Sequence, residues 1–144
     1  EWGAGKQYAL VELSGNSLAV EIGRASQILE LLPITPVPHT PSFVLGVCNV
    51  RGAIYSIVEL RMLLGLSMPE RVSDPLMILL EGERYSCGAT IEGVSEISWI
   101  PDSEIVAPPT DIPYISGLFR KGQNTVLVLD VDALFQSPEM VEFQ

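Results

Sequence analysis

The chain of 144 residues repeats itself at a spacing of about 70 positions, and this repeat strongly limits the folds it can adopt. Five landmarks recur in the same order, at offsets of 69 to 71 residues. A duplication of this length indicates two copies of one structural unit. The matched segments are residues 27–28 with 96–97, residues 37–38 with 107–108, Gly46 with Gly117, Gly52 with Gly122, and residues 57–60 with 128–131.

Each copy consists of short apolar stretches separated by glycine and proline turns, which is typical of β-strands. Small all-β units commonly close into barrels, because closure removes their exposed edges. We therefore predict an all-β fold of two five-stranded β-barrel subdomains that share a hydrophobic core, with short helices. Repeat one covers about residues 8–70 and repeat two about residues 75–136 of a single domain at 8–144. Residues 1–7 are expected to be a disordered or trimmed tail.

A hairpin in the first repeat carries an arginine at its tip. The apolar run that ends at Asn49 is followed by Val50-Arg51-Gly52 and then by a second apolar run from Ala53, so we expect two largely buried strands around this turn. Gly52 suits the turn because glycine adopts positive φ without a steric penalty. Arginine on a rigid turn beside apolar residues is a common interface anchor. Arg120 and Lys121 fall in the matching turn of the second repeat, where we expect them to pair with surface acids.

Three motifs surround this hairpin. They are a P-x-x-P-x-x-x-x-G spacing from Pro38 to Gly46, the sequence N-V-R-G at 49–52, and I-V-E-L-R at 57–61. Together they resemble the CheW family of bacterial chemotaxis coupling proteins, and the resemblance extends from about Tyr8 to Met140. It implies the same two-barrel architecture.

The resemblance also implies a function. Members of this family are non-enzymatic adaptors that link the cytoplasmic tip of a chemoreceptor to the regulatory domain of a CheA-type histidine kinase. The receptor is expected in the groove between the barrels, and the kinase at a barrel edge. The receptor-binding residues that the resemblance implies are Ala25, Gln27, Val47, Arg51 and Gly52.

Some positions differ from the usual family pattern. Gln27 stands where the family often has an acid, Ser56 replaces a proline, and Glu59 replaces an aspartate. These differences favour a divergent partner, such as one in a twitching-motility or other non-flagellar system. Two further alternatives are the regulatory module of a larger kinase and a ligand-binding or enzymatic β-domain, whose mark would be a deep polar pocket.

The composition excludes several classes of partner. Eight basic residues against 18 acidic ones give a net charge of −10, which would repel nucleic acid and an anionic membrane surface. No apolar stretch approaches the ~20 residues that cross a bilayer, so we expect no direct membrane insertion. Two cysteines are too few for a disulfide framework, which favours the cytoplasm, although a single pairing remains open.

Candidate chemical sites have little support. Glu59 and Asp130 are equivalent acids that could form a catalytic dyad, but neither has the Asp-Thr/Ser-Gly turn of aspartic proteases, and both suit the start of a short helix. His39 is the only histidine, and it has no nucleophile-elbow serine to serve. Cys48 and Cys87 stand where the other repeat has large apolar residues, so we expect buried thiols. We predict no catalytic residue, metal site or cofactor.

Overall fold

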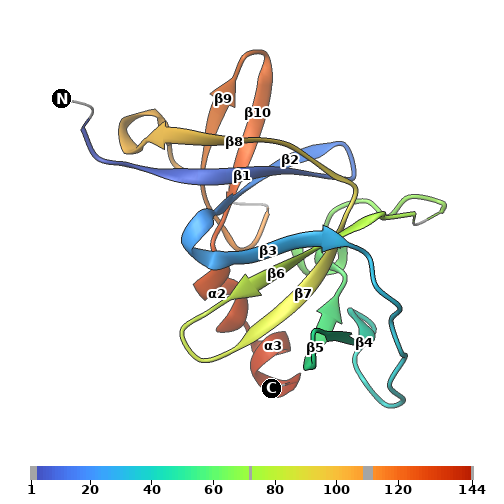
Figure 1. Ribbon diagram of the computed structural model, residues 1–144. Helices are drawn as coiled ribbons and strands as arrows, with labels where there is room; N and C mark the ends of the chain where they lie inside the picture. The colour runs from blue at the N-terminus through green and yellow to red at the C-terminus, as the bar shows by residue number, and fades with distance from the viewer. Residues whose placement is uncertain (1–2, 72, 109–111, 144) are drawn as a thin grey trace.

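The computed structural model describes residues 3–71, 73–108 and 112–143, and in that part of the chain ten strands and a few short helical segments form the fold (Figure 1). The strands of the first repeat are β1 (Gly5–Leu13), β2 (Asn16–Glu21), β3 (Ala25–Glu30), β4 (Val44–Val50) and β5 (Ala53–Val58). Those of the second are β6 (Leu76–Glu81), β7 (Ser86–Ile91), β8 (Gly93–Pro101), β9 (Ile115–Lys121) and β10 (Asn124–Leu129). The helical segments are η1 (Ile22–Arg24), α1 (Leu60–Leu64), η2 (Asp102–Glu104), α2 (Val131–Phe135) and α3 (Pro138–Phe143).

The strands form two five-stranded sheets with matching topology. The first sheet has the order β8-β1-β2-β10-β9, and the second has the order β3-β6-β7-β5-β4. Exchanging each strand for its counterpart in the other repeat converts one order into the other. Each sheet therefore contains strands of both repeats, joined at the parallel pairs β2–β10 and β5–β7 and at the antiparallel pairs β1–β8 and β3–β6. The prediction that each repeat builds its own subdomain was wrong, because each repeat places its first two strands in one sheet and its last three in the other.

The two sheets do not close into barrels. Their hydrogen-bonded orders are linear, and in the described part of the chain only one isolated bridge reaches the outer strand of each sheet. These bridges join Thr35 to Val47 on β4 and Val106 to Leu118 on β9, at equivalent positions. The prediction of an all-β fold with two five-stranded units is confirmed, but the predicted closed barrels are replaced by two curved sheets.

Apolar residues of β1 alternate between two cores, which explains how the sheets are held together. Ala9, Val11 and Leu13 belong to a central cluster that also contains Ile78 and Leu80 of the second sheet. The intervening residues Tyr8 and Leu10 face a smaller cluster confined to the first sheet. Met77 and Leu79 face a corresponding cluster of the second sheet. The expected shared core is thus present, and each sheet has a further core of its own.

The amino-terminal part of the chain is more ordered than predicted. β1 begins at Gly5 and pairs with both β2 and β8, so residues 5–7 are part of a strand and not of a tail. Residues 1–2, which the tail prediction also covered, lie outside the described residues. None of the helices in the described part of the chain has the length and apolarity of a membrane span.

Candidate functional site

The hairpin between β4 and β5 turns at Arg51 and Gly52. Val50 pairs with Ala53, so Arg51 and Gly52 are the two central residues of the turn. Their φ angles are 52° and 91°, and positive φ at both positions is the requirement of a type I′ turn. The side-chain oxygen of Asn49 accepts a hydrogen bond of 2.8 Å from the backbone N–H of Gly52. The N-V-R-G sequence therefore builds a defined turn that presents the arginine.

Arg51 is exposed, and among the described residues it forms no side-chain hydrogen bond or ion pair. Ile54, three residues further along, is 64% exposed. The sequence predicted a largely buried strand here, but β5 pairs with β7 only at Ile57 and Val58, so its first residues are paired with β4 alone. This hairpin therefore presents an arginine without a hydrogen bond or ion pair among the described residues and an exposed isoleucine. Both are suited to contact with a partner protein. Sequence reasoning missed Ile54, whose closeness to the turn was the available signal.

Val47 is held by the strand bridge at the edge of the second sheet. Its backbone N–H and carbonyl both bond to Thr35, at 2.9 and 2.8 Å. The close approach depends on Gly46, where a Cβ atom would lie 2.2 Å from the carbonyl oxygen of Thr35. The glycine of the P-x-x-P-x-x-x-x-G spacing thus has a structural role, and it fixes Val47, which is half-buried.

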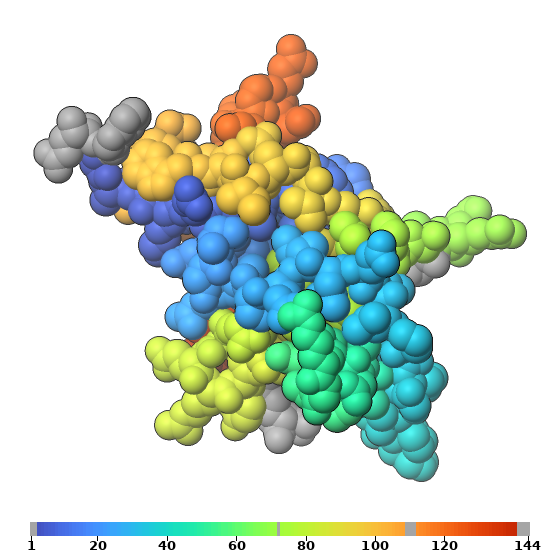
Figure 2. Space-filling model, in the orientation of Figure 1, coloured from blue at the N-terminus to red at the C-terminus, as the bar shows by residue number. Residues whose placement is uncertain are grey.

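Ala25 and Gln27 lie on β3, which is the edge strand at the other end of the same sheet. Both are half-buried, and the pairing of β3 with β6 shifts register between them. The shift leaves Ser26 exposed, and its hydroxyl donates to Glu81 at 3.0 Å. On the face drawn in Figure 2, the surface of β3 is bordered by that of β8 and by that of the β4–β5 hairpin. Val47, Arg51 and Gly52 share one hairpin, and the role of all five residues in binding stays a prediction.

The hairpin of the second repeat differs from the expectation. Lys121 pairs with Asn124, so Gly122 and Gln123 form the turn, and Arg120 and Lys121 are the last residues of β9. The expected surface pairing is present for Lys121, which lies 3.3 Å from Glu96. Arg120 donates instead to the backbone carbonyl of Gln123, at 3.4 Å. The structural register aligns Arg51 with Gly122, one position away from the sequence match.

A buried arginine, which the sequence analysis did not single out, lies at the end of the same motif block. Arg61 of α1 is fully buried, and its Nε donates to Glu59 at 2.7 Å while Nη2 donates to the other oxygen of that carboxylate at 3.0 Å. The guanidinium also bonds to Asp74, which is buried, and to Glu92, at 3.4 Å. Burial alone would lower the pKa of Arg61, but hydrogen bonds and charges of Glu59 and Asp74 raise it above the usual range. Arg61 therefore has a structural role, because its charge is buried and neutralised by carboxylates of this protein.

The two equivalent acids begin helices, as predicted. Glu59 caps α1 by accepting from the backbone N–H of Arg61, and Asp130 caps α2 by accepting from the N–H of Ala133, each at 3.0 Å. Carboxylates at these positions satisfy backbone donors that would otherwise lack a partner. The helix-capping interpretation is confirmed.

The remaining candidate groups fit a structural interpretation. Cys48 and Cys87 are free and buried, and burial raises the pKa of both thiols, to about 12 for Cys87. His39 is exposed in the loop before β4. Among the described residues, no group of three or more His, Cys, Asp or Glu side chains could hold a metal ion.

Two matched five-stranded sheets, with an uncommitted arginine and an exposed isoleucine on one hairpin, define a β-sheet interaction module. Comparison with known proteins identifies the family. Residues 7–139 match the CheW-like domain, so the chain belongs to this family of chemotaxis coupling scaffolds.

Individual relatives agree with this assignment. The chain is similar to the chemotaxis protein CheW of Rhizobium meliloti, with 26% identity over 94% of this chain and 90% of the relative. It is 27% identical to the chemotaxis protein CheW of Treponema pallidum, over 94% of this chain and 86% of the relative. Its fold is similar to the crystal structure of the scaffolding protein TtCheW from Thermoanaerobacter tengcongensis, with a TM-score of 0.83 and 22% identity, covering 94% and 91% of the two chains.

Proposed function

We propose that this protein couples a chemoreceptor to a CheA-type histidine kinase, as a scaffold in the cytoplasm without catalytic activity of its own. Its family membership and its relatives named as chemotaxis proteins support the pathway. The observation that carries the receptor contact is Arg51, an exposed cation without a partner among the described residues, on a turn set by Gly52.

The proposed receptor surface is made of the β4–β5 hairpin and the neighbouring part of β3. Arg51 would pair with an acidic side chain of the receptor tip, and Ile54 would be covered by apolar side chains. Val47 would act through the hairpin that it anchors, and Ala25 and Gln27 would contact the receptor from β3. Because Gln27 is neutral, it would not repel an acidic side chain of the receptor, whereas the acid that the family often has at this position would.

The substitution Arg51→Glu tests the receptor contact. We expect it to abolish co-purification with the receptor tip, because the charge at the centre of the contact is reversed. The free energy of unfolding should change by less than about 0.5 kcal/mol, since the side chain is exposed and forms no hydrogen bond or ion pair among the described residues. The measurements are pull-down from the native organism and urea denaturation.

Arg120→Glu is the matched control, because Arg120 is an exposed arginine near the tip of the other hairpin. It should leave receptor binding unchanged. Equal loss of binding in both variants would mean that overall charge governs the interaction, and the proposal for Arg51 would fail. Unfolding of the Arg51 variant would make this arginine a structural residue.

A further inference from the structure

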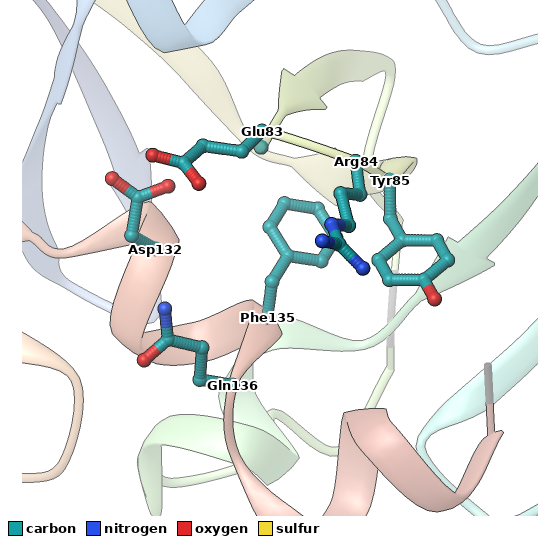
Figure 3. Close-up of a pocket in the computed structure, with 7 residues that line it drawn as sticks. Glu83, Arg84, Tyr85, Asp132, Phe135 and Gln136 are labelled. Carbon is teal, nitrogen blue, oxygen red and sulfur yellow. The ribbon is translucent and has the colours of Figure 1, made fainter.

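A hollow of about 440 Å³ lies between the β6–β7 turn and the end of α2, away from the residues assigned to the receptor. Phe135 forms its apolar floor, and Figure 3 shows this ring between the carboxylates of Glu83 and Asp132 on one side and Arg84 and Tyr85 on the other. Gly82 passes so close to the ring that a Cβ atom would lie 2.8 Å from it. The hollow is therefore formed by an ordered turn packed on an aromatic side chain.

In the first repeat, the chain itself fills the corresponding place. Leu64 of α1 is the counterpart of Phe135, and the helix ends at Gly65 in a left-handed conformation. The N–H of Leu66 then bonds to the carbonyl of Arg61 at 2.8 Å, and Leu66 packs against the central core. The hydroxyl of Ser14, in the β1–β2 turn, donates to the carbonyl of Ser67 at 2.7 Å. An extended leucine–serine segment thus connects the helix end to the turn.

In the second repeat, the chain takes another direction. Gln136 caps α2 in a right-handed conformation, and the chain continues through Ser137 into α3. The β6–β7 turn spans four residues, 82–85, whereas the β1–β2 turn spans two, 14–15. Among the described residues no hydrogen bond connects this longer turn to α2. The place that the chain occupies in one repeat is consequently open in the other.

Several polar side chains around the hollow have no partner among the described residues. Within the described structure, the side chains of Glu83, Arg84, Tyr85 and Gln136 have no hydrogen bond or ion pair, whereas Asp132 is paired with Arg24 at 2.7 Å. Tyr85 is 49% exposed. Arg84 and Gln136 can donate hydrogen bonds to a peptide carbonyl, as the Ser14 hydroxyl does to Ser67 in the first repeat. Arg84 is also a free cation in a chain with a net charge of −10.

We propose that this hollow binds an extended peptide segment of another protein that carries a leucine-like side chain and, two residues later, an acidic residue. The leucine would lie on Phe135, as Leu66 lies against the core in the first repeat. A backbone carbonyl would accept from Gln136, and the acidic side chain would pair with Arg84. This site is additional to the proposed receptor contact.

The test is a titration of the full, isotope-labelled chain with the peptide acetyl-Gly-Leu-Ser-Glu-amide, followed by NMR. We expect the amide resonances of residues 82–85 and of Gln136 to move. Replacing the leucine of the peptide by serine should weaken binding at least tenfold, since the buried area of one leucine corresponds to such a factor. Arg84→Ala should weaken binding several-fold, and Arg120→Ala, an exposed arginine elsewhere, should not change it.

Other results would overturn the proposal. Resonances that move at another surface, or equal affinity for the leucine and serine peptides, would show that the hollow does not select an apolar anchor. Concentration-dependent shifts of the same amides without peptide would assign the hollow to a second copy of this chain. Unchanged affinity of Arg84→Ala would remove the role of the acidic residue. None of these readouts involves the receptor, so they are independent of the result for Arg51.

Discussion

The helices α1 and α2 occupy equivalent places in the two repeats, yet they carry opposite charges at the same position. Arg61 on α1 corresponds to Asp132 on α2, 71 residues later. Arg61 bonds to Glu92, where the chain crosses from β7 to β8 and from one sheet to the other. Asp132 bonds to Arg24, at the matching crossover from β2 to β3. Each repeat therefore ties its helix to a crossover by an ion pair, with the signs reversed.

The ion pairs that connect the two helices to the crossovers differ in how far they are buried. Arg61 is fully buried, and two of its three carboxylate partners are buried with it. Arg24 and Asp132 have side chains that are 30% and 40% exposed. A buried ion network is costly to break, because removing one member leaves uncompensated charges in the interior, whereas an exposed pair contributes little. Arg61 is thus held by a buried network that includes its bond to the crossover, whereas the second connection rests on one partly exposed ion pair.

The largest expected effect is that of Arg61→Leu. This change leaves Glu59 and Asp74 buried without a cation, and it should lower the free energy of unfolding by about 3–5 kcal/mol or prevent folding altogether. Arg24→Leu, the matched change in the other tie, should cost less than about 1 kcal/mol, and less still at high salt. Urea denaturation of both variants measures the difference. Equal costs would show that burial does not distinguish the two ties.

A second comparison uses the glycines beside the two strand bridges. Gly46→Ala places a methyl group 2.2 Å from the carbonyl oxygen of Thr35, at a φ of 145°, and should cost about 2–3 kcal/mol. At Gly117 a Cβ atom would lie 2.5 Å from Cγ2 of Ile105, which can rotate, and 2.9 Å from the backbone carbonyl oxygen of Val106. The backbone contact is less severe than at Gly46, so Gly117→Ala should cost about 1–2 kcal/mol. Thermal unfolding measures both, and a larger cost at Gly117 would contradict this account.

The smallest expected effect concerns Glu96, which pairs with Lys121 on the second hairpin. A hydrogen bond from Ser98, and then the interaction with Lys121, hold the pKa of Glu96 below its usual value. The resulting stabilisation is present above the unfolded-state pKa and is lost as the pH falls through the folded-state pKa. Ser98→Ala and Lys121→Ala should therefore each raise the Glu96 pKa, as measured by NMR titration of the carboxyl carbon. Arg51→Ala on the first hairpin is the control and should leave it unchanged.

Much of the fold could be predicted because its signals are local. The strands, the turn at Gly52 and the helix caps at Glu59 and Asp130 depend on residues close in sequence. The sequence match aligned Gly52 with Gly122, whereas the strand register aligns Arg51 with it. Either position of a two-residue turn can adopt positive φ, so residue identity alone leaves an uncertainty of one position.

Other features depend on contacts between distant segments. The chain passes from one sheet to the other before β3 and again before β8, and this is decided by which strand edges become available once both repeats fold together. Arg61 stands in a short amphipathic helix where an arginine is normally solvated, and its burial requires Asp74 and Glu92 to converge from elsewhere. Nothing in the local sequence indicates either outcome.

For the candidate site, the chain sequence by itself determined the hairpin, its arginine and the turn that presents it, since a type I′ turn needs only neighbouring residues. The tertiary structure alone decided that Arg51 is exposed without a partner among the described residues, whereas Arg61 is buried. It also decided that Ile54 is exposed, and that a hollow lies beside Phe135 where Leu66 fills the equivalent place near Leu64. These properties depend on which surfaces cover which side chains, and that is a consequence of long-range packing.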